Sequence, residues 1–267
     1  MKTIFFLLFG LFFSVIANAQ NYNFKITYEE TEAGEYTIFA TNDEYHPISL
    51  RLNFKMKNMR LADVGYKIYT VEGKSKQALT SLKVISKLMP YEFSYTYFYN
   101  FGNDGSVDYD KDYVYGLPFN NEYTYKVIQG FNGSYSHTGK YAIDFEMPEG
   151  SEIMAIRDGI VVRIIDTNNS GCPSIDCVDL NNYVVIYHSD GTFANYSHLM
   201  QHGALVEVGE KVMQGQVIGL SGNTGFSSGP HLHLEVFIQR LNYTETLPIK
   251  FLLGNGNIDF LEENRYY

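Results

Sequence analysis

His231 and His233 stand two positions apart, and of all the residues in this sequence their types and spacing are best suited to a chemically active site. They lie in residues 228–236, which alternate in the manner of a β-strand. Because side chains in a strand repeat every two residues, both histidines point to one face, with their Cα atoms about 6.6 Å apart. One histidine could bind a metal ion while the other reaches a group held by that ion. The alternative is a polar strand face that happens to carry two histidines.

Three further residues of suitable chemistry lie on apolar, strand-like segments. His137 precedes a turn and a predicted strand over residues 141–145, and His198 ends another predicted strand. Asp144 stands between Ile143 and Phe145, and we expect this alternation to carry it toward the interior. A buried aspartate is costly unless it is paired or bound to a metal. Five such residues on apolar strands favour a shared site.

Imidazole nitrogens and carboxylates are the usual zinc ligands, and three protein ligands leave a fourth position for water. Zinc lowers the pKa of that water to about 7, and the two remaining histidines could act on the water and on a developing oxyanion. There is no H-E-x-x-H motif, and Ser221 lacks the final glycine of a nucleophile elbow. These residues predict a hydrolytic site with one zinc ion per chain, but they do not say which histidine plays which part.

The composition predicts an all-β protein, with 23 Tyr, 19 Phe, 23 Gly and no Trp. Residues 50–56 and 91–101 alternate like strands with one buried face, and such strands need a second sheet to cover them. We therefore expect an N-terminal β-sandwich. After Pro118 short strands recur between glycine-rich turns, and the expected segments are 153–156, 160–165, 183–188, 193–198, 212–220 and 231–238. The predicted domains are 20–117, a β-rich accessory domain, and 118–246, the domain that carries the hydrolytic site, with a tail over 247–267.

The first residues predict export to the periplasm or the exterior. Lys2 is followed by an apolar run over 4–16 and by an A-x-A cleavage site at 17–19, so residues 1–19 are expected to form a signal peptide. This run is too short for a stable membrane span. Removing it leaves 267 − 19 = 248 residues and takes away one lysine and no acid, so the net charge changes from −10 to −11. Such an acidic chain argues against nucleic acid as a partner.

Cys172 and Cys177 are the two cysteines of the chain. In an exported protein the leading interpretation is a disulfide that closes a short loop, and the alternative is a pair of free thiols. A turn-rich loop is a poor setting for a catalytic thiol. His188 and His202 are expected to be structural or surface residues.

Residues 128–238 resemble the catalytic domain of the lysostaphin/LytM-type zinc endopeptidases, which cleave peptide cross-links of bacterial cell walls. The resemblance is carried by four motifs in order, at residues 137–144, 196–199, 217–225 and 229–233. It implies an antiparallel β-sheet groove as the fold and the stem or cross-link peptides of peptidoglycan as the partner. One departure is the spacing between the first histidine and the aspartate, which is seven residues here and four in lysostaphin-like members.

The resemblance also implies roles for single residues. His137, Asp144 and His233 would bind zinc. His198 and His231 would be catalytic, one as general base and the other stabilising the oxyanion. The loop with the two cysteines looks like an insertion that could border the groove. Two alternatives stay open: an inactive module that binds the cell wall or activates a hydrolase, and a peptidase that acts on proteins. Nothing in the sequence indicates the oligomeric state.

Overall fold

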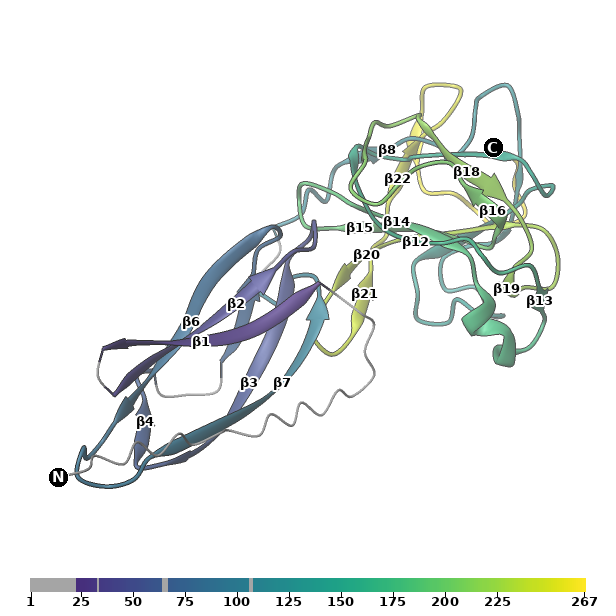
Figure 1. The fold of residues 1–267 in the computed structure, drawn as a ribbon. Helices are drawn as coiled ribbons and strands as arrows, with labels where there is room; N and C mark the ends of the chain where they lie inside the picture. Colours follow the sequence, from purple (N-terminus) through teal and green to yellow (C-terminus); the bar gives the residue numbers. More distant parts are fainter. Residues whose placement is uncertain (1–22, 33, 64–66, 106–107) are drawn as a thin grey trace.

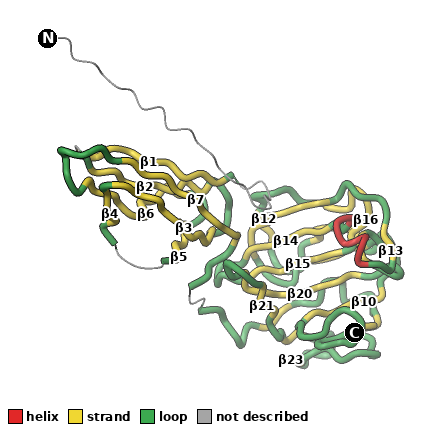
Figure 2. The backbone as a smooth tube through the Cα atoms, turned by 90° about the horizontal axis from the view of Figure 1, so that it is seen from below, coloured by secondary structure: helices red, strands yellow, loops and turns green. Residues whose placement is uncertain are grey.

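The computed structural model describes residues 23–32, 34–63, 67–105 and 108–267. The predicted signal peptide lies outside these residues. The described chain is almost wholly β-structure, with one short helix, η1 (Ile175–Leu180), drawn in red in Figure 2. The all-β prediction is therefore confirmed. Within the described residues, no helix has both the length and the apolar character needed to cross a membrane.

Two antiparallel sheets make up the N-terminal half, the purple to blue part of Figure 1. One has the order β1-β2-β6-β4 and the other β5-β3-β7. Side chains of both sheets meet in one apolar cluster, to which β2 contributes Ala40 and β3 contributes Leu50. The alternation seen in the sequence over residues 50–56 places Leu50 on the inner face. The strands are β1 (Phe24–Glu32), β2 (Glu35–Asn42), β3 (Ile48–Lys57), β4 (Met59–Leu61), β5 (Ile68–Val71), β6 (Ser75–Val84) and β7 (Glu92–Phe101).

An eight-stranded antiparallel sheet organises the C-terminal half, in the order β17-β12-β14-β15-β20-β10-β9 with β21 on β20. Its inner face carries the main core, where Tyr196 is fully buried and its hydroxyl accepts a 2.9 Å hydrogen bond from the backbone N–H of Ile156. The strands are β9 (Lys126–Gln129), β10 (Ala142–Glu146), β12 (Gly159–Ile165), β14 (Tyr183–Tyr187), β15 (Phe193–Ser197), β17 (Lys211–Val212), β20 (Leu232–Gln239) and β21 (Thr244–Thr246).

The opposite face of this sheet joins the two halves. On that face Phe193 stacks on Phe237 at 5.5 Å between ring centroids, and Phe101 of β7 packs edge-on against Phe193 at 5.2 Å. His233 shares the face with Phe237, four residues and about 13 Å farther along β20. The N-terminal half therefore covers one end of the face that carries the predicted site.

The expected strand over residues 212–220 is wrong in one respect, because it is two strands. Gly215 turns the chain with a positive φ of 82°. Before the turn β17 joins the large sheet, and after it β18 (Val217–Ser221) joins a second sheet of order β11-β18-β16. Its other members are β11 (Glu152–Met154) and β16 (Leu199–Ala204). A continuous apolar pattern does not reveal such a turn.

Residues expected as a tail contribute to the core. Strand β22 (Lys250–Leu252) pairs in parallel with β8 (Val114–Tyr115) and in antiparallel fashion with β23 (Ile258–Asp259). Phe251 and Leu261 are buried in the main core. The last small sheet pairs β13 (Gly171–Cys172) with β19 (Gly225–Phe226) in parallel.

Candidate metal centre

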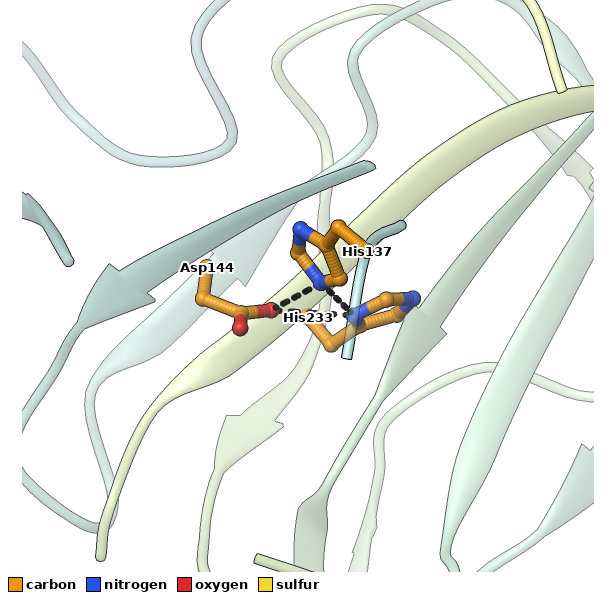
Figure 3. A group of neighbouring side chains, drawn as sticks. All are labelled: His137, Asp144 and His233. Atoms are coloured by element: carbon orange, nitrogen blue, oxygen red, sulfur yellow. Dashed lines mark hydrogen bonds and ion pairs between the residues drawn. The ribbon is translucent and has the colours of Figure 1, made fainter. Parts of the chain in front are cut away.

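The side chains of His137, Asp144 and His233 converge at one end of the large sheet, on the face opposite the main core (Figure 3). Nδ1 of His233 lies 2.9 Å from Oδ1 of Asp144, and Nε2 of His137 lies 3.2 Å from each of these two atoms. One oxygen and two nitrogens thus form a nearly equilateral triangle. The sequence prediction placed these three residues together, and the structure does so too.

This triangle fits a tetrahedral metal ion. Ligand atoms held at roughly 2.0–2.1 Å around tetrahedral zinc stand about 3.3 Å from one another. The observed edges of 2.9 to 3.2 Å are close to that separation. Two imidazole nitrogens and one carboxylate oxygen are also a donor set that zinc accepts. His137, Asp144 and His233 can therefore hold a metal ion.

Strand pairing and a turn bring the three residues together. Asp144 of β10 and His233 of β20 are direct partners in the antiparallel register. His137 precedes β10 in a turn, in which the backbone N–H of Lys140 bonds to the carbonyl of His137 at 2.8 Å and Gly139 has a φ of 74°. This turn takes up the longer spacing between the first histidine and the aspartate.

Groups around the cluster orient its members. The backbone carbonyl of Gly130 accepts a 3.1 Å bond from Nδ1 of His137, so the neutral ring presents Nε2 with a lone pair. The amide of Gln129 donates to Oδ2 of Asp144 at 2.8 Å. Glu235 lies two residues beyond His233 on the same face, with Oε2 3.8 Å from Nε2 of that histidine. Sequence reasoning missed Gln129 and Glu235; the period of two in β20 could have indicated Glu235, but no local pattern indicates Gln129.

The charges at the cluster are strongly coupled. Burial opposes the charge on Asp144, but the hydrogen bonds from His137 and His233 outweigh it and hold the pKa of this carboxyl well below its usual range. Burial likewise opposes a charge on His233, yet its bond to Asp144 and the nearby Glu235 raise its pKa to about 10. Both shifts favour a protonated His233 paired with an ionised Asp144. A cation binding there must displace that proton.

His198 and His231 lie beside the cluster with their rings 4.5 Å apart between centroids. Nδ1 of His198 donates to the carbonyl of Thr224 at 2.7 Å, and Nδ1 of His231 donates to the carbonyl of Gly229 at 2.8 Å. Nε2 of His231 is 4.0 Å from Oδ1 of Asp144. Each neutral ring therefore turns an unprotonated Nε2 away from its backbone partner.

Both rings are held neutral by their surroundings. Burial lowers the pKa of His198 to about 3, and the neighbouring His231 and His233 add to this effect. Burial is also the main cause of the lowered pKa of His231. Neutral imidazoles can accept protons at neutral pH.

The other residues singled out in the sequence lie elsewhere. Cys172 and Cys177 form a disulfide, as predicted. His188 is fully buried and its Nδ1 donates to the carbonyl of Asp158 at 2.8 Å, while His202 is exposed. Neither belongs to the metal cluster, which agrees with their expected structural or surface roles.

The family model described as peptidase family M23 matches residues 138–245, which include Asp144, His198, His231 and His233. The chain carries a domain of peptidase family M23. The resemblance to the lysostaphin/LytM-type family is therefore confirmed. His137 lies immediately before the matched range.

Curated relatives of this M23 domain include peptidoglycan DD-endopeptidase ShyA of Vibrio cholerae, 42% identical over 96 residues. This match covers 36% of the chain and 20% of the relative. Glycyl-glycine endopeptidase ALE-1 of Staphylococcus capitis is 34% identical over 151 residues, which are 56% of the chain and 35% of the relative. The chain thus spans no more than about a third of the length of these two relatives.

Among solved structures, the catalytic domain of lysostaphin from Staphylococcus simulans is similar to the M23 domain. It aligns with 27% identity and a TM-score of 0.35, covering 46% of this chain and 87% of that one.

Proposed function

We propose that this chain is an exported zinc metalloendopeptidase that hydrolyses peptide cross-links of bacterial peptidoglycan. One observation carries the proposal: His137, Asp144 and His233 converge to within 3.2 Å of one another, beside two further buried histidines, in a domain of family M23. A structural role alone does not require five such side chains at one point of a sheet.

His137, Asp144 and His233 are the proposed metal ligands. Zinc held by them would supply a Lewis acid for a peptide carbonyl and for a water molecule. Gly130 and Gln129 hold His137 and Asp144 in the orientation in which their ligand atoms would face the ion. Such outer contacts fix the tautomer of a ligating histidine and the direction of a ligating carboxylate.

His198 and His231 are the proposed catalytic residues. Because each ring donates its Nδ1–H to a backbone carbonyl, Nε2 is the atom left to accept a proton from an attacking water. The same nitrogen can then return the proton to the leaving amine. The ring that faces the oxyanion must carry a proton on Nε2 to donate a hydrogen bond to it. The geometry is compatible with either assignment of the two roles.

The substrate proposal rests on the relatives. Two of them are named as endopeptidases for peptidoglycan or for glycyl-glycine bonds. A cell-wall substrate also agrees with the export predicted from residues 1–19.

Digestion of purified cross-linked wall fragments tests the proposal. The mature chain, loaded with one equivalent of zinc, is expected to release cross-link peptides that mass spectrometry identifies. Binding of the fragments without cleavage would indicate an inactive wall-binding module instead. Cleavage of unrelated proteins with no effect on wall fragments would indicate a general peptidase.

A further inference from the structure

The disulfide-closed loop lies against the segment that carries the two catalytic histidines. We define the cystine loop as residues 170–182, which contain β13, the disulfide and η1. Figure 1 shows β13 and β19 beside the helix at one end of the domain, and β13 pairs with β19. None of the proposed metal ligands or catalytic residues lies in the cystine loop. Any role of the loop in the site must therefore act through its contacts with other residues.

The first connection runs from the end of the loop to His198. Oδ1 of Asn181 accepts a 3.0 Å hydrogen bond from the backbone N–H of His198, and Nδ2 of Asn181 donates to Oγ of Ser197 at 3.1 Å. His198 has a φ of 67°, a left-handed conformation that is costly for a residue with a side chain. A partner for its N–H helps to hold the strained backbone, and with it the direction of the imidazole.

The second connection runs from the start of the loop to His231. The carbonyls of Ser170 and Cys172 accept bonds of 3.1 Å from the N–H groups of Gly225 and Ser227. Oγ of Ser227 then lies 3.1 Å from Nδ1 of His231. The loop therefore reaches the backbone of His198 directly and the ring of His231 through Ser227.

The metal ligands are supported from a different direction. Among the described residues, the hydrogen bonds of the His137, Asp144 and His233 side chains run to Gly130, to Gln129 and to one another. No hydrogen bond described for these side chains comes from the cystine loop. Disturbing the loop should consequently move the catalytic pair and leave the metal in place.

The loop cannot hold its own shape by packing. Its helix η1 buries none of its six residues. A segment without an apolar core gains rigidity from a covalent link, because the link removes conformations that the open loop would sample. The Cys172–Cys177 bond joins β13, whose Cys172 makes one of these contacts, to η1, which Asn181 caps at its C-terminal end.

We propose that the cystine loop is a positioning element for catalysis, with Asn181 as the residue that sets His198 and the disulfide as the brace that holds the loop. The proposal rests on the proposed hydrolytic function. Asn181 acts through His198 and does not itself contact substrate.

Replacing Asn181 tests the first contact. Asn181→Ala is expected to lower kcat about 10- to 100-fold with little change in KM, as misplacement of a reacting group does. Zinc content should stay at one equivalent. Asn181→Asp retains an acceptor for the N–H of His198 and should recover much of the lost kcat. Asp179→Asn, an exposed change in the same loop, is the matched control and should retain full activity.

A second measurement does not depend on turnover: NMR of the metal-loaded protein gives the rate at which the Nδ1–H proton of His198 exchanges with solvent. This proton is expected to exchange faster with solvent in Asn181→Ala than in the parent chain or in Asp179→Asn. An unchanged exchange rate with an unchanged kcat would overturn the role of Asn181.

The double change Cys172→Ser and Cys177→Ser tests the brace. It should lower kcat at least several-fold with zinc retained. Loss of zinc would refute the separation between the loop and the metal, and full activity would refute the role of the disulfide as a brace. Failure of the parent chain to cleave wall fragments would instead count against the proposed function, while the NMR comparison would still decide the positioning of His198.

Discussion

The side-chain amide of Gln129 donates a hydrogen bond of 2.8 Å to Oδ2 of Asp144, the oxygen that points away from the two histidines. The same amide donates to Oγ of Ser136 at 2.8 Å, and its carbonyl accepts from the N–H groups of Tyr135 and Ser136 at 3.0 Å. Gln129 thus fixes the carboxylate of one proposed ligand and the backbone immediately before another, His137.

Gln129→Ala is expected to weaken zinc binding about 10- to 100-fold, because loss of an outer partner of a ligand has effects of that size. Competition with a chromophoric chelator measures the Kd. Gln201→Ala removes an exposed glutamine of the same domain and is the matched control. Equal affinities in the two variants would show that Gln129 has no part in the site.

The two histidines of β20 are expected to differ when replaced. His233→Ala should lose both zinc and hydrolysis, because it removes one of the three proposed ligand atoms. His231→Ala should keep zinc and lose hydrolysis. Elemental analysis of the purified variants, together with digestion of wall fragments, separates the two cases. A metal-free His231→Ala protein would reverse the assignment.

Tyr196→Phe is expected to destabilise the fold by about 1–3 kcal/mol, since it leaves the buried N–H of Ile156 without its acceptor. Urea unfolding measures the change. Tyr123→Phe, at a residue that is 58% exposed, should leave the free energy of unfolding nearly unchanged. A neutral Tyr196→Phe would mean that another group takes over the acceptor role.

His188 should make stability depend on pH. Burial lowers its pKa from 6.5 to about 4, and its Nε2 has no hydrogen-bond partner among the residues that the structure describes. Because the folded pKa is lower than the unfolded one, the unfolded chain takes up the extra proton first as the pH falls. Stability is therefore lost between about pH 6.5 and 4, by on the order of 3 kcal/mol at the acid end.

His188→Gln removes this titration, so its unfolding free energy should fall less between pH 7 and 4 than that of the parent chain. Urea titrations at several pH values, with both proteins in the same metal-free buffer, give the difference. Parallel curves would exclude His188 as the source.

Local pattern was sufficient for much of the fold. The alternation around His231 and His233 predicted β20 and the shared face of the two histidines, because a strand repeats every two residues. The rows at 50–56 and 91–101 likewise predicted β3 and β7. The turn at Gly215 was not predicted, because the apolar pattern continues across it. The break is visible only in the pairing, since β17 and β18 join different sheets.

The composition and motifs of the sequence determined the all-β class, the set of five chemically suited residues and the family. Tertiary structure alone decided what orients them. His137 and His233 are 96 positions apart, and the pairing of β10 with β20 sets Asp144 against His233. Gln129, Asn181 and the buried Phe251 of the expected tail acquire their roles by contact with distant segments. Such contacts leave no local period, because they depend on which strands become neighbours in the folded sheet.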